Sequence, residues 1–133
     1  MTDTDFAYEV NKVNAKNISV CMGQCHSGGF IDNLESPGRV IMTACRYDET
    51  SHTSNFYYDD FVHHWTDAVN NDYGADTDND GQVSMSEAFA YAVSHDVNTE
   101  NPQFSSLPSS LGANLCLMND YSGYIAGSSY IIR

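Results

Sequence analysis

Cys25 is the residue of this 133-residue sequence whose position best suits nucleophilic chemistry. It follows the apolar run ISVCM at 18–22 and precedes Gly28 and Gly29, which permit a sharp turn of the backbone. The carboxyl end of a buried strand is where ligands bind in open α/β sheets. A thiolate also needs a base, and His26 is a weak candidate because adjacent side chains point apart. We therefore expect attack by sulfur, with loop amides that stabilise a developing oxyanion, and a buried structural cysteine as the alternative.

The segment DTDNDGQVSMSE at 76–87 predicts a calcium site. An EF-hand loop supplies oxygen ligands from its first, third, fifth, seventh, ninth and twelfth residues, and the glycine at its sixth position permits a sharp turn. Gly81 occupies that sixth position here. The predicted ligands are Asp76, Asp78, Asp80, the backbone carbonyl of Gln82, Ser84 and a bidentate Glu87. The alternative is an acidic surface loop that binds no ion tightly. Calcium sensors usually carry paired loops, so this single loop favours a structural Ca²⁺ that fixes the start of a helix at 84–95.

The charge balance excludes two classes of partner. Only 5 Lys and Arg residues stand against 18 Asp and Glu residues, a formal net charge of −13. Nucleic acids and anionic membrane surfaces require a cationic surface, so we expect neither as a partner. No apolar run approaches the roughly 18 residues of a membrane span. Cys21 and Cys45 fall inside apolar runs and are predicted to be buried and unpaired.

The elements that position these residues alternate between helix and strand, as in α/β folds. Apolar residues repeat at helical spacing between residues 3 and 17, and apolar runs at 18–22 and 39–45 predict two buried strands. The two strands are too far apart for a tight hairpin, so a parallel crossover is expected between them.

The second half of the chain predicts two further helices. One starts at residue 59 and the other spans 84–95, each with apolar residues on one face. Pro, Gly and Ser residues predict a loop at 98–112. Apolar runs at 114–118 and 124–132 predict two more strands.

Three blocks of this sequence resemble the caspase-like and legumain-like cysteine peptidases. ISVCMGQCHSGGF resembles their nucleophile segment, RVIMTACRYDETSH the strand after it, and FYYDDFVHHW the following segment with Asp, aromatic residues and Trp. The calcium-type loop, AFAYAVSHD and ENPQFSS are similar to bacterial and archaeal members of the legumain-like group. The resemblance spans about residues 4–118.

The resemblance implies a caspase-like α/β/α sandwich with a mostly parallel sheet, of which residues 1–133 form the carboxyl-terminal portion. It implies hydrolysis of a peptide bond in a peptide or protein substrate through a thioester on Cys25. The family places its catalytic His-Gly pair upstream of the nucleophile, and none of the 24 residues before Cys25 is histidine. We therefore expect an N-terminal segment or chain of the same peptidase to supply the histidine, and the present chain alone to be inactive.

The resemblance also implies substrate-binding roles for Thr50, Ser51 and Asp59. The family carries an acid two residues before the nucleophile, where this sequence has Gly23, and this difference disfavours a preference for asparagine. A carboxylate such as Asp59 or Asp48 can instead pair with an arginine or lysine of the substrate.

Two other classes of function stay open at this point. One is a catalytically inactive caspase-like domain that serves as a calcium-stabilised binding or structural module. The other is a different hydrolase or transferase that uses Cys25. The compartment is unknown. Because millimolar calcium is extracellular, an extracellular or cell-envelope location is expected if an upstream signal exists.

Overall fold

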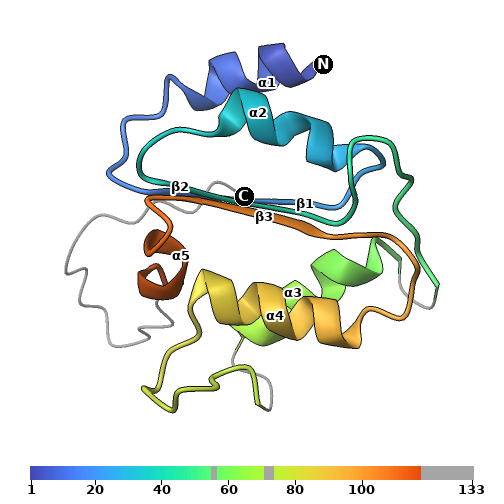
Figure 1. The fold of residues 1–133 in the computed structure, drawn as a ribbon, viewed down its shortest axis with the longest axis vertical. Coiled ribbons are helices and arrows are strands. Elements are labelled where there is room, and N and C mark those ends of the chain that lie inside the picture. Colours follow the sequence, from blue (N-terminus) through green and yellow to red (C-terminus); the bar gives the residue numbers. More distant parts are fainter. Residues whose placement is uncertain (55–56, 71–73, 118–133) are drawn as a thin grey trace.

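The computed structural model of the chain describes residues 1–54, 57–70 and 74–117. In order along the chain, its elements are α1 (Asp3–Val10), β1 (Ile18–Met22), the 3-10 helix η1 (Ser27–Phe30), α2 (Ile31–Leu34), β2 (Arg39–Thr43), α3 (Asp60–Val69), α4 (Met85–His95), β3 (Gln103–Leu107) and α5 (Leu111–Asn114). Helices α1 and α2 cover one face of the sheet, and α3, α4 and α5 cover the other (Figure 1). The predicted α/β class is confirmed.

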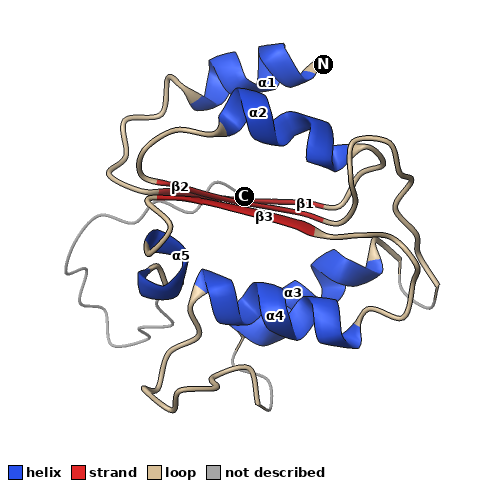
Figure 2. Cartoon of the chain, in the orientation of Figure 1, coloured by secondary structure: helices blue, strands red, loops and turns tan. Residues whose placement is uncertain are grey.

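The sheet is small and mixed. Its strand order is β1-β2-β3, with β2 in the middle. Figure 2 shows the sheet edge-on, between the two groups of helices. β1 and β2 are parallel, with Ile18 opposite Arg39, as the crossover length predicts. β3 runs antiparallel to β2, with Leu107 opposite Arg39. The described residues therefore hold one parallel and one antiparallel pair, so the expectation of a mostly parallel sheet is not met among them.

β1 and β2 are apolar because both of their faces are covered. Every residue of β2 is buried. Val40 and Met42 pack on the α3 and α4 side with Phe61, while Ile41 packs on the α1 and α2 side with Leu34. Alternate side chains of a strand point to opposite faces, so a strand buried on both sides needs a continuous apolar run. This is the pattern that predicted both strands.

Capping residues set where the helices begin. Thr2 and Asp5 form a capping box at the start of α1, and Ser84 and Glu87 form another at the start of α4. The side chain of Asp59 accepts a hydrogen bond from the Val62 amide and caps α3. Both helices predicted in the second half are confirmed.

The predicted loop at 98–112 is wrong, because β3 lies within it and α5 begins in it. Pro102 and Pro108 flank β3 instead of interrupting it, so the missing proline amides remove no hydrogen bond of the strand. The predicted strand at 114–118 does not form in its described part, where Cys116 makes only an isolated bridge to Ser84.

The last predicted strand, at 124–132, lies outside the described residues. Among the helices that the structure does describe, none is long and apolar enough to cross a membrane.

Candidate functional site

Cys25 lies in the turn that joins the carboxyl end of β1 to η1, and its side chain is exposed. Its Sγ atom is 3.8 Å from the Ser51 Oγ atom and 3.9 Å from the Ser51 carbonyl oxygen. The Ser51 hydroxyl also donates a hydrogen bond of 2.6 Å to the carbonyl oxygen of Gly23. The structure thus brings together two of the predicted site residues, Cys25 and Ser51, which are 26 positions apart in the sequence.

The backbone amides after Cys25 are already occupied. The amides of residues 26–29 donate to the carbonyl oxygens of Glu49, Gln24, Cys45 and His26, at distances from 2.8 to 3.2 Å. Within the described part of the chain, no acceptor binds the Cys25 amide. Of the loop amides expected to stabilise an oxyanion, only the Cys25 amide is therefore available among the described residues.

The side chain of His26 lies against the backbone of Tyr47. Its backbone has a left-handed conformation, with a φ of 62°, and its Nδ1 atom lies 2.9 Å from the carbonyl oxygen of Tyr47. Three other histidines, His63, His64 and His95, form a row of neighbouring rings on α3 and α4. None of the described histidines is hydrogen-bonded to the Cys25 thiol.

Among the cysteines, Cys25 is the exposed one, and all four thiols are free. Cys45 is buried, and its thiol contacts the carbonyl oxygens of Gln24 and Glu49. Burial, with the charge of Asp59, raises the pKa of the Cys21 thiol. Of the two cysteines predicted to be buried, Cys45 is buried and Cys21 is half-buried, whereas Cys25 is the thiol that a reagent reaches most easily.

Asp59 lies directly against Gly23, two residues before Cys25. A Cβ atom added to Gly23 would come within 2.9 Å of the Asp59 Cβ atom and 2.7 Å of the Val62 Cγ2 atom. Only glycine fits here without a shift of these neighbours. Asp59 is 9% exposed. Thr50 is exposed and precedes Ser51.

The environment of Asp59 disfavours its charged form. Burial raises the pKa of Asp59 to about 6, against the hydrogen bond from the Val62 amide, and the charges of Glu100, Asp96 and Asp60 add to the increase. Asp48, the other carboxylate considered for a basic substrate, is exposed and pairs with Arg46 at 3.0 Å.

The sequence analysis missed Asp96 and Glu100. They follow α4, near the end of a segment predicted as a helix and in one predicted as a loop, and only the packing of α4 against α3 brings them near Asp59. In the sequence, only their acidic side chains could have indicated a role in a site.

The loop at 76–87 assembles part of the predicted cation site. Asp76, Asp78 and Asp80 each present a carboxylate oxygen within 4.8 Å of the others, so the three could hold a metal ion. Amides inside the loop hold these side chains in place. The Gly81 amide donates to Asp76 at 2.9 Å and the Gln82 amide to Asp80 at 2.8 Å. Gly81 has a φ of +89°, which is the turn that the sixth position requires.

Glu87 is not a member of this group of carboxylates. Its Oε1 atom accepts hydrogen bonds of 2.9 Å from the amide and hydroxyl of Thr77, and its Oε2 atom accepts from Ser84. These bonds outweigh desolvation and lower the pKa of Glu87 to about 2. Asp78 differs. The amide of Asp80 lowers its pKa, but desolvation and the charges of the surrounding carboxylates outweigh that bond, and the pKa is raised.

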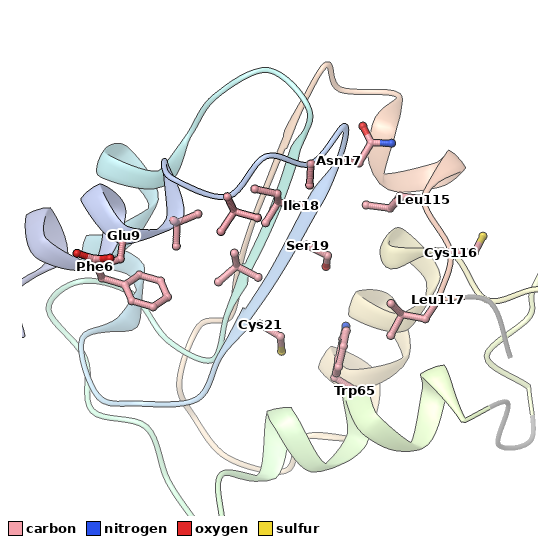
Figure 3. A pocket seen from close by; sticks show the side chains of 14 residues that line it. Phe6, Glu9, Asn17, Ile18, Ser19, Cys21, Trp65, Leu115, Cys116 and Leu117 are labelled. Carbon is pink, nitrogen blue, oxygen red and sulfur yellow. The ribbon is translucent and has the colours of Figure 1, made fainter. Parts of the chain in front are cut away.

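An apolar groove of about 690 Å³ runs along β1, on the edge that faces away from β2. α1, β1, Trp65 and residues 115–117 line it. Figure 3 shows Cys21, Trp65 and Leu117 around the space. Cys25 is not among the lining residues, so this groove is separate from the exposed thiol.

Comparisons of the chain with protein-family models, with curated proteins and with solved structures give no match.

Proposed function

We propose that this chain is the nucleophile-bearing portion of a cysteine-type endopeptidase with a caspase-like α/β/α sandwich. The observation that supports it best is the exposed Cys25 thiol at the carboxyl end of a parallel strand, beside Ser51 and with its own amide free. In the proposed reaction, the thiolate attacks the carbonyl carbon of a peptide bond and the amine leaves with a proton. Water then hydrolyses the thioester.

Each nearby residue has a role in this proposal. The Cys25 amide donates to the oxyanion that forms during attack. Ser51 holds the turn through its bond to Gly23, and Thr50, Ser51 and Asp59 contact the substrate. A histidine from an N-terminal segment or chain of the same peptidase takes the thiol proton and gives it to the leaving amine, so the present chain alone is inactive.

We also propose that the loop at 76–87 binds a structural Ca²⁺. The ligands would be Asp76, Asp78, Asp80, the Gln82 carbonyl, Ser84 and Glu87, and the last would exchange its bonds to Thr77 for the ion. The supporting observation is the convergence of three aspartates in a loop with the required glycine conformation. The ion would neutralise several carboxylates and hold the start of α4.

The peptidase proposal is tested with the chain joined to the upstream segment of its coding region. We expect peptide cleavage that is lost in Cys25→Ser without a change in thermal stability, and pH-dependent alkylation of Cys25 by iodoacetamide. The buried Cys45 serves as the internal control for alkylation. Turnover by Cys25→Ser would remove Cys25 from the role of nucleophile.

A catalytically inactive caspase-like, calcium-stabilised module is the second candidate. It is favoured by one observation, that no histidine in the described residues is hydrogen-bonded to Cys25. The same experiment separates the two. A Cys25 that stays inert in the joined protein, while Ca²⁺ still raises the melting temperature, supports the module.

A further inference from the structure

Three carboxyl groups that come from separate parts of the chain act on one another near the start of α3. They belong to Asp59, Asp96 and Glu100, and we call them the acidic cluster. One oxygen of each accepts a backbone amide, at 2.9, 3.0 and 3.2 Å respectively. The second oxygen of each is buried and has no hydrogen-bond partner in the part of the chain that the structure describes.

This arrangement destabilises the folded protein when no ligand is bound. Buried carboxylate oxygens without donors lose their hydration and gain nothing in return. Among the described residues, no lysine or arginine forms an ion pair with the cluster. The neighbouring Asp60 shows the contrast, because it is more deeply buried than any of the three but its oxygens accept hydrogen bonds from Ser54 and Asn98. The cluster is therefore short of donors in a way that Asp60 is not.

The carboxylates repel one another as well. Burial raises the pKa of Glu100, and the charge of Asp96 contributes to the increase. The charges of Glu100 and Asp96 likewise raise the pKa of Asp59. A cation placed between the three groups would remove this repulsion and supply the missing hydrogen bonds.

The spacing of the cluster favours an organic cation over a metal ion. Asp76, Asp78 and Asp80 form the described trio whose ligand atoms lie within 4.8 Å of one another, and the acidic cluster does not meet that limit. A guanidinium group is wider than a metal ion and carries five N–H donors in one plane, so it can reach several carboxylates at once. An arginine side chain therefore matches the negative charge of the cluster and can donate to more than one of its carboxylates.

The cluster is linked to the thiol by two consecutive residues. Ser51 contacts the Cys25 sulfur at 3.8 Å, and the amide of the next residue, His52, donates to Glu100 at 3.2 Å. On the other side, Asp59 lies against Gly23, two residues before Cys25. A substrate chain held at Cys25 would thus have the acidic cluster as its neighbour.

We propose that the acidic cluster binds the guanidinium group of a substrate arginine, the residue whose carbonyl carbon Cys25 attacks. The inference rests on the proposed peptidase function for the role of that arginine, whereas the binding of a guanidinium group can be tested without catalysis. It assigns substrate-binding roles to Asp96 and Glu100 in addition to Asp59, and it makes arginine the preferred residue.

The first experiment measures binding to the whole chain by calorimetry at pH 7.5. The probe is Nα-acetyl-arginine amide, and Nα-acetyl-norleucine amide has a side chain of similar length without the charge. We expect the arginine probe to bind at least tenfold more tightly than the norleucine probe. Asp59→Asn and Glu100→Gln should each weaken arginine binding about tenfold, because each removes a charge-assisted hydrogen bond. Asp32→Asn removes an exposed charge on α2 and should have no effect. Equal binding of both probes, or no loss in either cluster variant, would overturn the proposal.

The second experiment separates this proposal from the peptidase function. Peptidyl chloromethyl ketones with arginine or norleucine next to the reactive group are added to the joined protein, and chloride displacement by Cys25 is followed by mass spectrometry. Faster labelling by the arginine reagent, lost in Glu100→Gln, supports both proposals. Equal labelling by both reagents keeps the nucleophile and rejects the cluster as its specificity site. An inert Cys25 in a chain that still binds the arginine amide rejects the peptidase and keeps the guanidinium site.

Discussion

Asp59→Asn should make the protein more stable at neutral pH, although it alters a buried side chain that caps a helix. Asparagine caps helices as well as aspartate does, so the hydrogen bond to the Val62 amide can be kept. What the substitution removes is a charge that is 9% exposed and faces Glu100 and Asp96. The stabilisation should therefore depend on pH.

The size of the effect follows from the pKa of Asp59. Its value is about 6 in the folded protein, against an ordinary value of 3.8. At about 1.4 kcal/mol per pKa unit, this difference corresponds to about 3 kcal/mol. Below about pH 4 the carboxyl group is protonated in both states and costs nothing. Between about pH 4 and 6 only the unfolded state loses its proton, so stability falls as the pH rises. Above about pH 6 the cost is constant.

Urea unfolding of the parent chain and of Asp59→Asn at several values between pH 4 and pH 7 tests this directly. The free energies of unfolding should be similar near pH 4, and the variant should be more stable by about 3 kcal/mol at pH 7. Asp32→Asn, at an exposed position, should show no such dependence. A difference that stays constant with pH, or a variant that is less stable at pH 7, would refute the account of Asp59 as a buried, uncompensated charge.

Three further predictions concern the loop and the nucleophile segment. Ca²⁺ should raise the melting temperature and excess chelator should abolish the increase, and Asp76→Asn should weaken this response; an identical melt with and without chelator would count against the site. Gly81→Ala should destabilise the chain by about 1 kcal/mol in urea unfolding, because alanine is strained at a φ of +89°, and an unchanged free energy would contradict that conformation. Gly23→Ala should cost about 1–3 kcal/mol because its Cβ would lie 2.7 Å from Val62, whereas in Gly29→Ala the nearest atom is at 3.5 Å and the cost should be small. Equal stability of these two alanine variants would argue against the packing of Asp59 on the nucleophile segment.

The sequence predicted the strands and helices in which burial requires apolar residues. The strands at 18–22 and 39–43 were visible because a sheet covered on both faces requires continuous apolar runs. The helix at 85–95 was visible from its apolar face and from the loop before it. β3 was missed because Ser105 and Ser106 make it polar and prolines stand at both ends. Its strand conformation depends on pairing with β2, which no local pattern records.

The candidate site was predictable in part for a similar reason. Cys25 follows a strand that could be recognised, and the three loop aspartates follow a fixed spacing. The hydrogen bonds from Thr77 to Glu87 were not predictable, because they join residues ten positions apart and depend on the folded shape of the loop. The acidic cluster was not predictable either. Asp59 is separated from Asp96 by two helices, and only their packing brings the carboxylates together.

Helix α4 connects the cation loop to the acidic cluster. Its first cap, Ser84, belongs to the cation loop, and its last cap, Asp96, belongs to the acidic cluster. The helix has 11 residues and so spans about 16 Å as a stiff rod, buried at Met85, Ala88 and Ala92. Because α4 packs against α3, the same packing positions both the end of the cation loop and Asp96.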